Sequence, residues 1–155
     1  MRRLKSPKAV RGTVTLTRYA SMFMGNCLCN QVRFAFESRP TDVSVCHCSI
    51  CRRTTGSAFG VYVKVSDVDL KLTDGADQLN SYNVTDKLST RFCRVCGSTV
   101  FAQHADYPGF IYITLGALAE GSDIRPTYHE FVGSKASWFD IQDALPKFEE
   151  WSDSE

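Results

Sequence analysis

Hydrophobic and polar residues alternate in several short stretches of the chain, which is typical of half-buried β-strands. Residues 32–36 alternate with a period of two and predict a strand that ends near Pro40. The same period recurs over residues 59–65. Residues 110–115 are aromatic and β-branched and predict a buried strand, and residues 128–132 predict a further one.

Turn dipeptides separate these stretches, and helical patterns are short. Residues 74–75 (Asp-Gly) and 108–109 (Pro-Gly) predict turns. Short helical turns are predicted only after Cys51 and around residues 140–145. The pattern therefore predicts a compact, mainly β domain of antiparallel strands, and it leaves the order of the strands open.

The composition agrees with one globular domain. The chain has 155 residues, of which 43% are hydrophobic and 23% are charged, and these values are typical of soluble proteins. No apolar stretch approaches the length of a membrane span. We therefore expect a soluble, cytoplasmic protein without a membrane partner.

The charges are unevenly distributed along the chain. Residues 1–24 carry six basic residues and no acidic one, whereas residues 25–155 carry twelve basic and seventeen acidic residues, a net charge of −5. This mildly acidic body argues against nucleic acid as a partner. We predict a flexible basic leader over residues 1–22, a single domain over residues 23–151 and a frayed acidic tail over residues 152–155.

The basic leader has two further interpretations. It lacks an apolar core segment, so it is not a secretory signal. Its arginines and its lack of acidic residues also suit an organellar presequence, and a start of the protein at Met22 or Met24 would remove it altogether. Pro7 and Gly12 interrupt any amphipathic helix there, which favours the tail or the later start over the presequence.

The seven cysteines change the picture most. Their number is odd, so a disulfide framework would leave one thiol unpaired, and the absence of a secretory signal indicates a reducing compartment. Metal ligation is therefore the leading explanation for the cysteines, and their spacing supports it.

Two cysteine pairs predict a closed, structural zinc site. Cys93 and Cys96 form a Cys-x-x-Cys motif followed by Gly97, which can adopt the positive φ angle that a zinc-binding turn needs. Cys27 and Cys29 supply the remaining two sulfurs of a tetrahedral site, which would hold two distant segments together. The alternative for Cys93 and Cys96 is a redox dithiol, a motif that usually opens a helix after a parallel strand.

A second cluster lies in one short stretch. Cys46, Cys48 and Cys51 can surround one ion from a single loop, because the first two side chains leave an extended segment on the same side. Three protein ligands with one open position are typical of catalytic zinc. The alternative is that His47 is a fourth ligand, which would make this site structural as well.

The residues after this cluster are candidates for substrate binding. Arg52 and Arg53 could offset the negative charge of the thiolates or bind a substrate carboxylate, and the alternative is a solvated basic turn. His104 and His129 are predicted to be packing or surface residues. Four aromatic residues are predicted to be core residues, some of which could line a pocket: Tyr128, Phe131, Trp138 and Phe139.

Residues 46–56, together with the two cysteine pairs, resemble the glutathione-dependent formaldehyde-activating enzyme family, to which the centromere protein V domain also belongs. The resemblance extends from Gly25 to Trp151 and includes residues 32–34 (Val-Arg-Phe) and 97–101 (Gly-Ser-Thr-Val-Phe). One departure is Asn30, which stands where the family usually has glycine.

The resemblance implies an Mss4-like fold of β-hairpins around a four-cysteine structural zinc. It also implies a second, catalytic zinc on Cys46, Cys48 and Cys51. The implied reaction joins glutathione to formaldehyde and gives S-hydroxymethylglutathione, which is formally a carbon–sulfur lyase reaction in reverse. The implied partners are therefore two zinc ions and small thiol and aldehyde substrates.

Two other classes of function remain possible from the sequence. A zinc-stabilised binding module would have two structural zinc ions and would recognise a protein. A thiol redox protein would need free cysteines, whereas two zinc sites with four and three sulfurs would use all seven.

Overall fold

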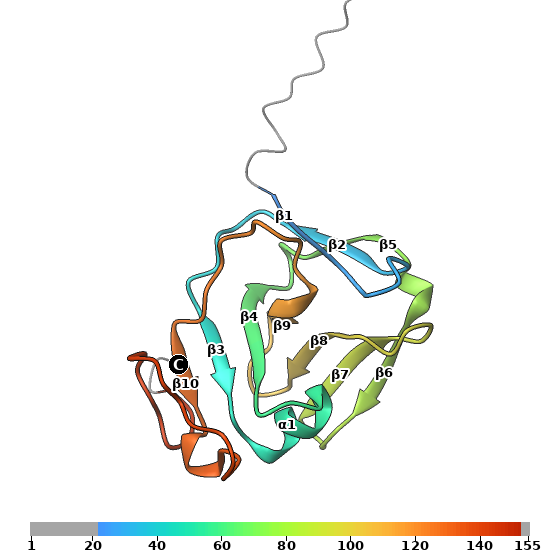
Figure 1. The fold of residues 1–155 in the computed structure, drawn as a ribbon. Coiled ribbons are helices and arrows are strands. Elements are labelled where there is room, and N and C mark those ends of the chain that lie inside the picture. The colour runs from blue at the N-terminus through green and yellow to red at the C-terminus, as the bar shows by residue number, and fades with distance from the viewer. Residues whose placement is uncertain (1–21, 153–155) are drawn as a thin grey trace, which may run out of the picture.

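The computed structural model describes residues 22–152 (Figure 1). The predicted leader and tail therefore lie outside the described residues, apart from Met22 and Ser152. No helix within residues 22–152 combines the length and apolarity that a membrane crossing requires.

The described residues form two sheets, and the prediction of a mainly β fold is confirmed. The smaller sheet has the order β1 (Phe23–Asn26), β2 (Arg33–Phe36) and β5 (Lys71–Asp74). The larger sheet has the order β10 (Tyr128–Glu130), β3 (Val43–Cys46), β4 (Gly60–Ser66), β9 (Phe110–Thr114), β8 (Thr99–His104), β7 (Leu88–Cys93) and β6 (Leu79–Asn83). All neighbouring strands are antiparallel except β10 and β3, which are parallel.

Helices are short in this part of the chain. One α-helix and three 3₁₀ turns occur among the described residues: α1 (Ser49–Thr55), η2 (Ala76–Gln78), η3 (Leu115–Ala117) and η4 (Val132–Ser134). Helix α1 lies below the larger sheet in Figure 1, directly after β3.

The predicted helical turn around residues 140–145 is wrong. Residues 140–150 instead run as an irregular segment beside β10, where the backbone N–H of His129 donates to the carbonyl of Pro146 and that of Phe148 donates to the carbonyl of His129. The proline disfavours the helical conformation in the residue before it, and these backbone bonds hold the segment against the edge of the larger sheet.

Strand β2 ends at Phe36, four residues before Pro40. The backbone N–H groups of Glu37 and Ser38 donate to the carboxylate of Asp69 at 3.1 and 2.8 Å. These two donors are therefore unavailable for pairing with a neighbouring strand, which ends β2 earlier than the sequence predicts.

The core lies between the two sheets. Phe34 of the smaller sheet packs edge-on against Phe101 of the larger one, with ring centroids 5.0 Å apart. Val63 and Ile113 are fully buried beside them. Burial of each such side chain stabilises the fold by about 2 kcal/mol, so this cluster holds the two sheets together.

The pleat of the larger sheet separates core from cavity. Side chains alternate between the two faces of a strand, and the odd-numbered residues of the central strands, such as Val63 and Ile113, face the core. Tyr62 on β4 and Tyr112 on β9 are even-numbered and line a cavity on the opposite face. The predicted buried strand over residues 110–115 is consequently buried only at Ile111 and Ile113.

Candidate active site

The four-cysteine cluster joins two segments that are distant in the sequence. The sulfurs of Cys27, Cys29, Cys93 and Cys96 all lie within 4.8 Å of one another. Cys29 Sγ lies 3.5 Å from Cys27 Sγ and 3.7 Å from Cys93 Sγ. Tetrahedral zinc with Zn–S bonds of about 2.3 Å places its sulfurs ~3.8 Å apart. The cluster could therefore hold a metal ion, and its geometry fits zinc.

Each cysteine pair lies in a tight turn. Gly97 has φ +75°, as the Cys-x-x-Cys-Gly motif predicts, and its N–H donates to the carbonyl of Cys93 at 2.8 Å. Asn30 after the first pair has φ +61°. Glycine and asparagine tolerate this left-handed conformation better than other residues, which explains how asparagine can replace the usual glycine here.

The three-cysteine cluster is built by the turn from β3 to α1. Cys46 ends β3 and is buried, Cys48 is the N-terminal cap of α1, and Cys51 lies in the first turn of the helix. The N–H of Cys51 donates to Cys48 Sγ at 3.3 Å. The three sulfurs lie within 4.8 Å of one another, so this cluster could also hold a metal ion.

The three thiols differ in how readily each loses its proton. Hydrogen bonds from Cys46 and Cys51 hold the pKa of the Cys48 thiol well below its usual value. Hydrogen bonds with Cys48 and Cys51, together with burial, raise the pKa of Cys46 far above its usual value. Without a cation, Cys48 is therefore the thiol that most readily loses its proton, whereas a bound cation would favour the thiolate form of all three. Three sulfurs are a donor set that suits zinc.

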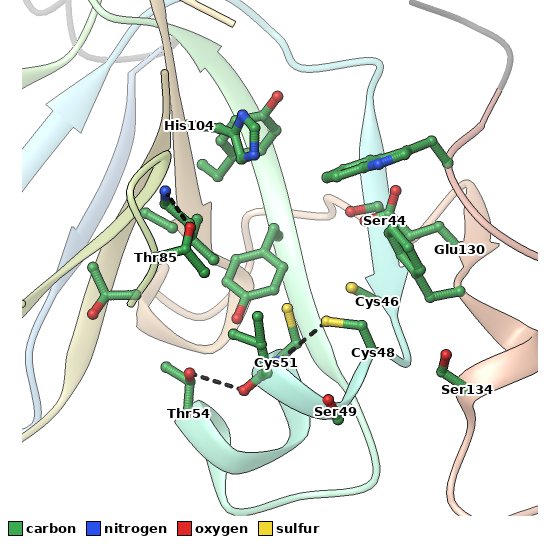
Figure 2. Close-up of a pocket in the computed structure, with 18 residues that line it drawn as sticks. Ser44, Cys46, Cys48, Ser49, Cys51, Thr54, Thr85, His104, Glu130 and Ser134 are labelled. Atoms are coloured by element: carbon green, nitrogen blue, oxygen red, sulfur yellow. Dashed lines mark hydrogen bonds between the residues drawn. The ribbon is translucent and has the colours of Figure 1, made fainter. Parts of the chain in front are cut away.

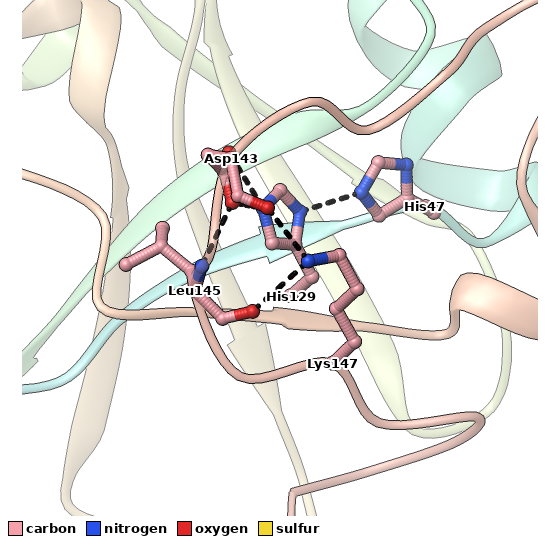
Figure 3. Close-up of polar contacts among 5 residues, drawn as sticks. All are labelled: His47, His129, Asp143, Leu145 and Lys147. Carbon is pink, nitrogen blue, oxygen red and sulfur yellow. Dashed lines mark hydrogen bonds and ion pairs between the residues drawn. The ribbon is translucent and has the colours of Figure 1, made fainter.

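His47 points away from these sulfurs, as expected for a residue between two metal-directed neighbours. Its ring is fully buried, and its Nε2 is hydrogen-bonded to Nδ1 of His129 at 2.9 Å (Figure 3). The Nε2 of His129 in turn contacts both carboxylate oxygens of Asp143 at 3.0 Å. Burial lowers the pKa of His47 to about 4, so the ring is neutral at pH 7. These hydrogen bonds connect the turn that carries Cys46 and Cys48 to the C-terminal segment that carries Asp143.

The three-cysteine cluster opens into a cavity of about 350 Å³ (Figure 2). Cys46, Cys48 and Cys51 lie at one side of it, and Glu130 and His104 extend from opposite walls. Apolar side chains make up much of the remaining lining: Ile50, Leu88, Ala102, Phe131 and Trp151. The four-cysteine cluster contributes no residue to this lining.

Tyr62 closes the cavity beside Cys51. Its ring folds back over Gly60, where a Cβ atom would lie 2.6 Å from the tyrosine ring. Glycine is therefore required at this position for the ring to adopt its place. Burial, together with the nearby Cys51, raises the pKa of Tyr62 far above its usual value, so its hydroxyl keeps its proton.

Glu130 is one of the cavity residues that the sequence analysis missed. It ends the short strand β10, which pairs in parallel with β3 so that Glu130 lies opposite Cys46. The side chain is buried, and this burial raises the pKa of its carboxyl group to about 7. The signal in the sequence is a single acidic residue inside the predicted strand over residues 128–132.

The structure does not bring Arg52 and Arg53 to the cavity. Arg52 is half-buried and its Nε donates to the carbonyl of His47 at 3.2 Å, whereas Arg53 is exposed. Neither lines the cavity. The position of these two arginines therefore does not support the prediction that they bind the substrate.

One of the four predicted core aromatics differs from expectation. The side chain of Trp138 is 73% exposed, because it lies in an irregular segment after η4, so its assignment to the core is wrong. Phe131 is half-buried and lines the cavity, as was allowed for some of these residues. Trp151, which the sequence analysis did not select, lines the cavity as well.

These features define a mainly β domain with two cysteine clusters that could each hold a metal ion. Residues 22–134 match the family described as glutathione-dependent formaldehyde-activating enzyme. The chain belongs to this family, and the resemblance that residues 46–56 indicated is confirmed.

Individual relatives agree with this assignment. A protein of Halomonas elongata is 30% identical over 128 residues, which cover 76% of this chain and 80% of that protein, and its provisional name is glutathione-dependent formaldehyde-activating enzyme. The crystal structure of a Rhodobacter sphaeroides protein is similar with a TM-score of 0.55 at 26% identity, over 66% of this chain and 91% of that one.

Proposed function

We propose that this protein is a zinc-dependent enzyme of the carbon–sulfur lyase type. It adds a thiol, with glutathione as the first candidate, to a small aldehyde such as formaldehyde, or catalyses the reverse reaction. The family and the name of the Halomonas relative support the two substrates.

One observation carries the proposal. Three sulfurs from a single short stretch meet beside a cavity, and His47, which could have completed a closed shell, is turned away from them. Cys46, Cys48 and Cys51 would hold the catalytic zinc, and Cys27, Cys29, Cys93 and Cys96 would hold the structural one. A zinc ion with three protein ligands supplies an open position and acidifies a thiol or polarises a carbonyl that binds there.

The residues of the chain that line the cavity would position the two substrates, and one of them would carry the proton. Apolar walls limit the access of water, and Tyr62 packs beside Cys51. In the addition, the thiol sulfur forms a bond to the carbonyl carbon while the C=O π electrons move to oxygen. The thiol proton must then reach that oxygen. The carboxylate of Glu130, which lines the cavity and pairs with Cys46 on the neighbouring strand, would accept this proton and return it.

The test is the rate at which glutathione and formaldehyde combine in the presence of the full, zinc-loaded chain. Exchange spectroscopy by NMR measures this rate at equilibrium against the uncatalysed reaction. We expect a protein-dependent acceleration that is lost when the zinc is removed from the three-cysteine cluster. A protein that holds two zinc ions and accelerates neither direction would instead be a zinc-stabilised binding module.

A further inference from the structure

We propose that His129 and Asp143 are positioning residues for the three-cysteine metal site and that they act through His47. This inference rests on the metal site of the proposed function, and it adds residues that do not themselves line the cavity. It follows from the place of His47 in the turn, from the groups that hold it and from the proton that the two imidazole rings share.

His47 is the single residue between two of the cysteines that would hold the metal ion. Cys46 is fixed by β3, which pairs with β10 on one side and with β4 on the other. Cys48 follows as the N-terminal cap of α1. Each residue has two backbone angles that rotate freely, so the φ and ψ angles of His47 largely set where Cys48 lies relative to Cys46.

The backbone and the ring of His47 are both held by other residues. Its N–H donates to the carbonyl of Glu130 at 3.0 Å, and its carbonyl accepts from Nε of Arg52 at 3.2 Å. The Nε2 atom of its ring is bonded to Nδ1 of His129 at 2.9 Å (Figure 3). The first two bonds restrict the peptide groups on either side of His47, and the third fixes the direction of its side chain.

The proton between the two rings is placed by Asp143. The N–H of Leu145, together with His129, holds the pKa of the Asp143 carboxyl group below its usual value, so the group is a carboxylate at pH 7 and can only accept. His129 therefore has a proton on Nε2. A further proton on Nδ1 of His129 would force the one proton of His47 onto its Nδ1, which has no partner among the described residues. A buried N–H without an acceptor is destabilising, so Nε2 of His47 donates to His129.

The hydrogen bonds therefore run in one direction, from His47 through His129 to Asp143. Both later members are fixed in turn, because the N–H of Leu145 donates to Oδ1 of Asp143 at 3.0 Å and the N–H of His129 donates to the carbonyl of Pro146 at 2.8 Å. A turn that is already ordered loses less conformational freedom when a metal ion binds. Removal of groups that orient metal ligands typically weakens metal binding ~10–100-fold.

The test is the affinity of the three-cysteine cluster for zinc, measured on the full chain by competition with a chelator of known affinity. D143A removes the last acceptor, so we expect the dissociation constant to rise ~10–100-fold. The amide oxygen in D143N can still accept from Nε2 of His129, so this variant should stay within about threefold of the original protein. The four-cysteine cluster in the same molecule is the internal control and should keep its affinity in both variants.

A matched control variant lies in the same irregular segment. The side chain of Asp140 is 88% exposed, and its contact with Nζ of Lys135 at 3.9 Å is an ion pair at the surface. Such pairs contribute little to stability. D140A should therefore leave the zinc affinity of both clusters unchanged.

Nitrogen NMR of the histidine side chains tests the direction of the hydrogen bonds, which a general loss of stability would not report. We expect His47 to have its proton on Nε2 in the zinc-loaded protein. A proton on its Nδ1 would overturn this inference, as would an unchanged affinity in D143A, equal weakening of both clusters in D143A, or a loss of ~10-fold or more in D143N. None of these measurements requires turnover. A selective loss of zinc in D143A, together with no acceleration of the addition to formaldehyde, would overturn the proposed reaction and support this inference.

Discussion

The two cysteine clusters differ in how the chain brings their sulfurs together. The four-cysteine cluster takes two pairs separated by 64 residues, at the ends of different sheets, whereas the three-cysteine cluster comes from one turn between β3 and α1. Only the second cluster lines the cavity. A closed cluster that joins distant segments can stabilise the fold. An open cluster within one local turn can lose a ligand, and with it activity, while the rest of the fold remains intact.

The largest expected effect is on stability, from C96S. A structural zinc site contributes on the order of 10 kcal/mol to folding, which is comparable with the whole stability of a small domain. We expect this variant to be unfolded or to lose its cooperative thermal transition. Circular dichroism during heating measures this, and a native-like transition would show that the four-cysteine cluster does not stabilise the fold.

C48S should show the opposite balance between stability and activity. Turnover should fall on the order of 10³-fold or more, because the open zinc site loses a ligand. The melting temperature should fall far less than in C96S, since β3 and α1 are also held by strand pairing and helix bonds. Equal destabilisation by the two substitutions would contradict the division of roles between the clusters.

E130Q should affect the reaction while both clusters keep their metal. The amide has the same shape as the carboxyl group but cannot carry the proton, so kcat should fall by about 10²–10⁴-fold. Zinc content and melting temperature serve as the control measurements. Full activity in this variant would remove Glu130 from the mechanism and leave proton transfer to water.

G60A is expected to have the smallest effect of this series. The added methyl group would meet the Tyr62 ring at 2.6 Å, and such overpacking costs about 1–3 kcal/mol. Urea denaturation measures the loss. Gly116 has no atom within 4 Å of an added Cβ, so G116A is the matched control and should change the free energy of unfolding by less than about 0.5 kcal/mol. A similar loss in both variants would mean that the position of Tyr62 does not depend on Gly60.

Local spacing explains what could be predicted of the fold and site. The turn at Gly97 follows from a motif of five residues, and the outward direction of His47 follows from the alternation of Cys46 and Cys48 around it. The strand at residues 60–66 follows from its period of two. Each of these features depends on residues a few positions apart, so the sequence pattern contains the necessary information.

Long-range pairing explains what could not be predicted. Glu130 reaches the cavity because β10 pairs in parallel with β3, 84 residues earlier in the sequence, and Trp151 reaches it because the final segment runs along β10. No periodic pattern reports such pairings. Conversely, Arg52 follows Cys51 directly, but each helical residue rotates by about 100°, so proximity in sequence did not place it in the cavity.

The number of sulfur ligands per zinc, measured by X-ray absorption with and without glutathione, tests the central claim most directly. One closed and one open site predict a mean of ~3.5 sulfurs per zinc, which rises to ~4 when a thiol enters the open position. A mean of ~3.5 that glutathione does not change, or a mean of ~4 before any thiol is added, would contradict an open site that accepts a thiol.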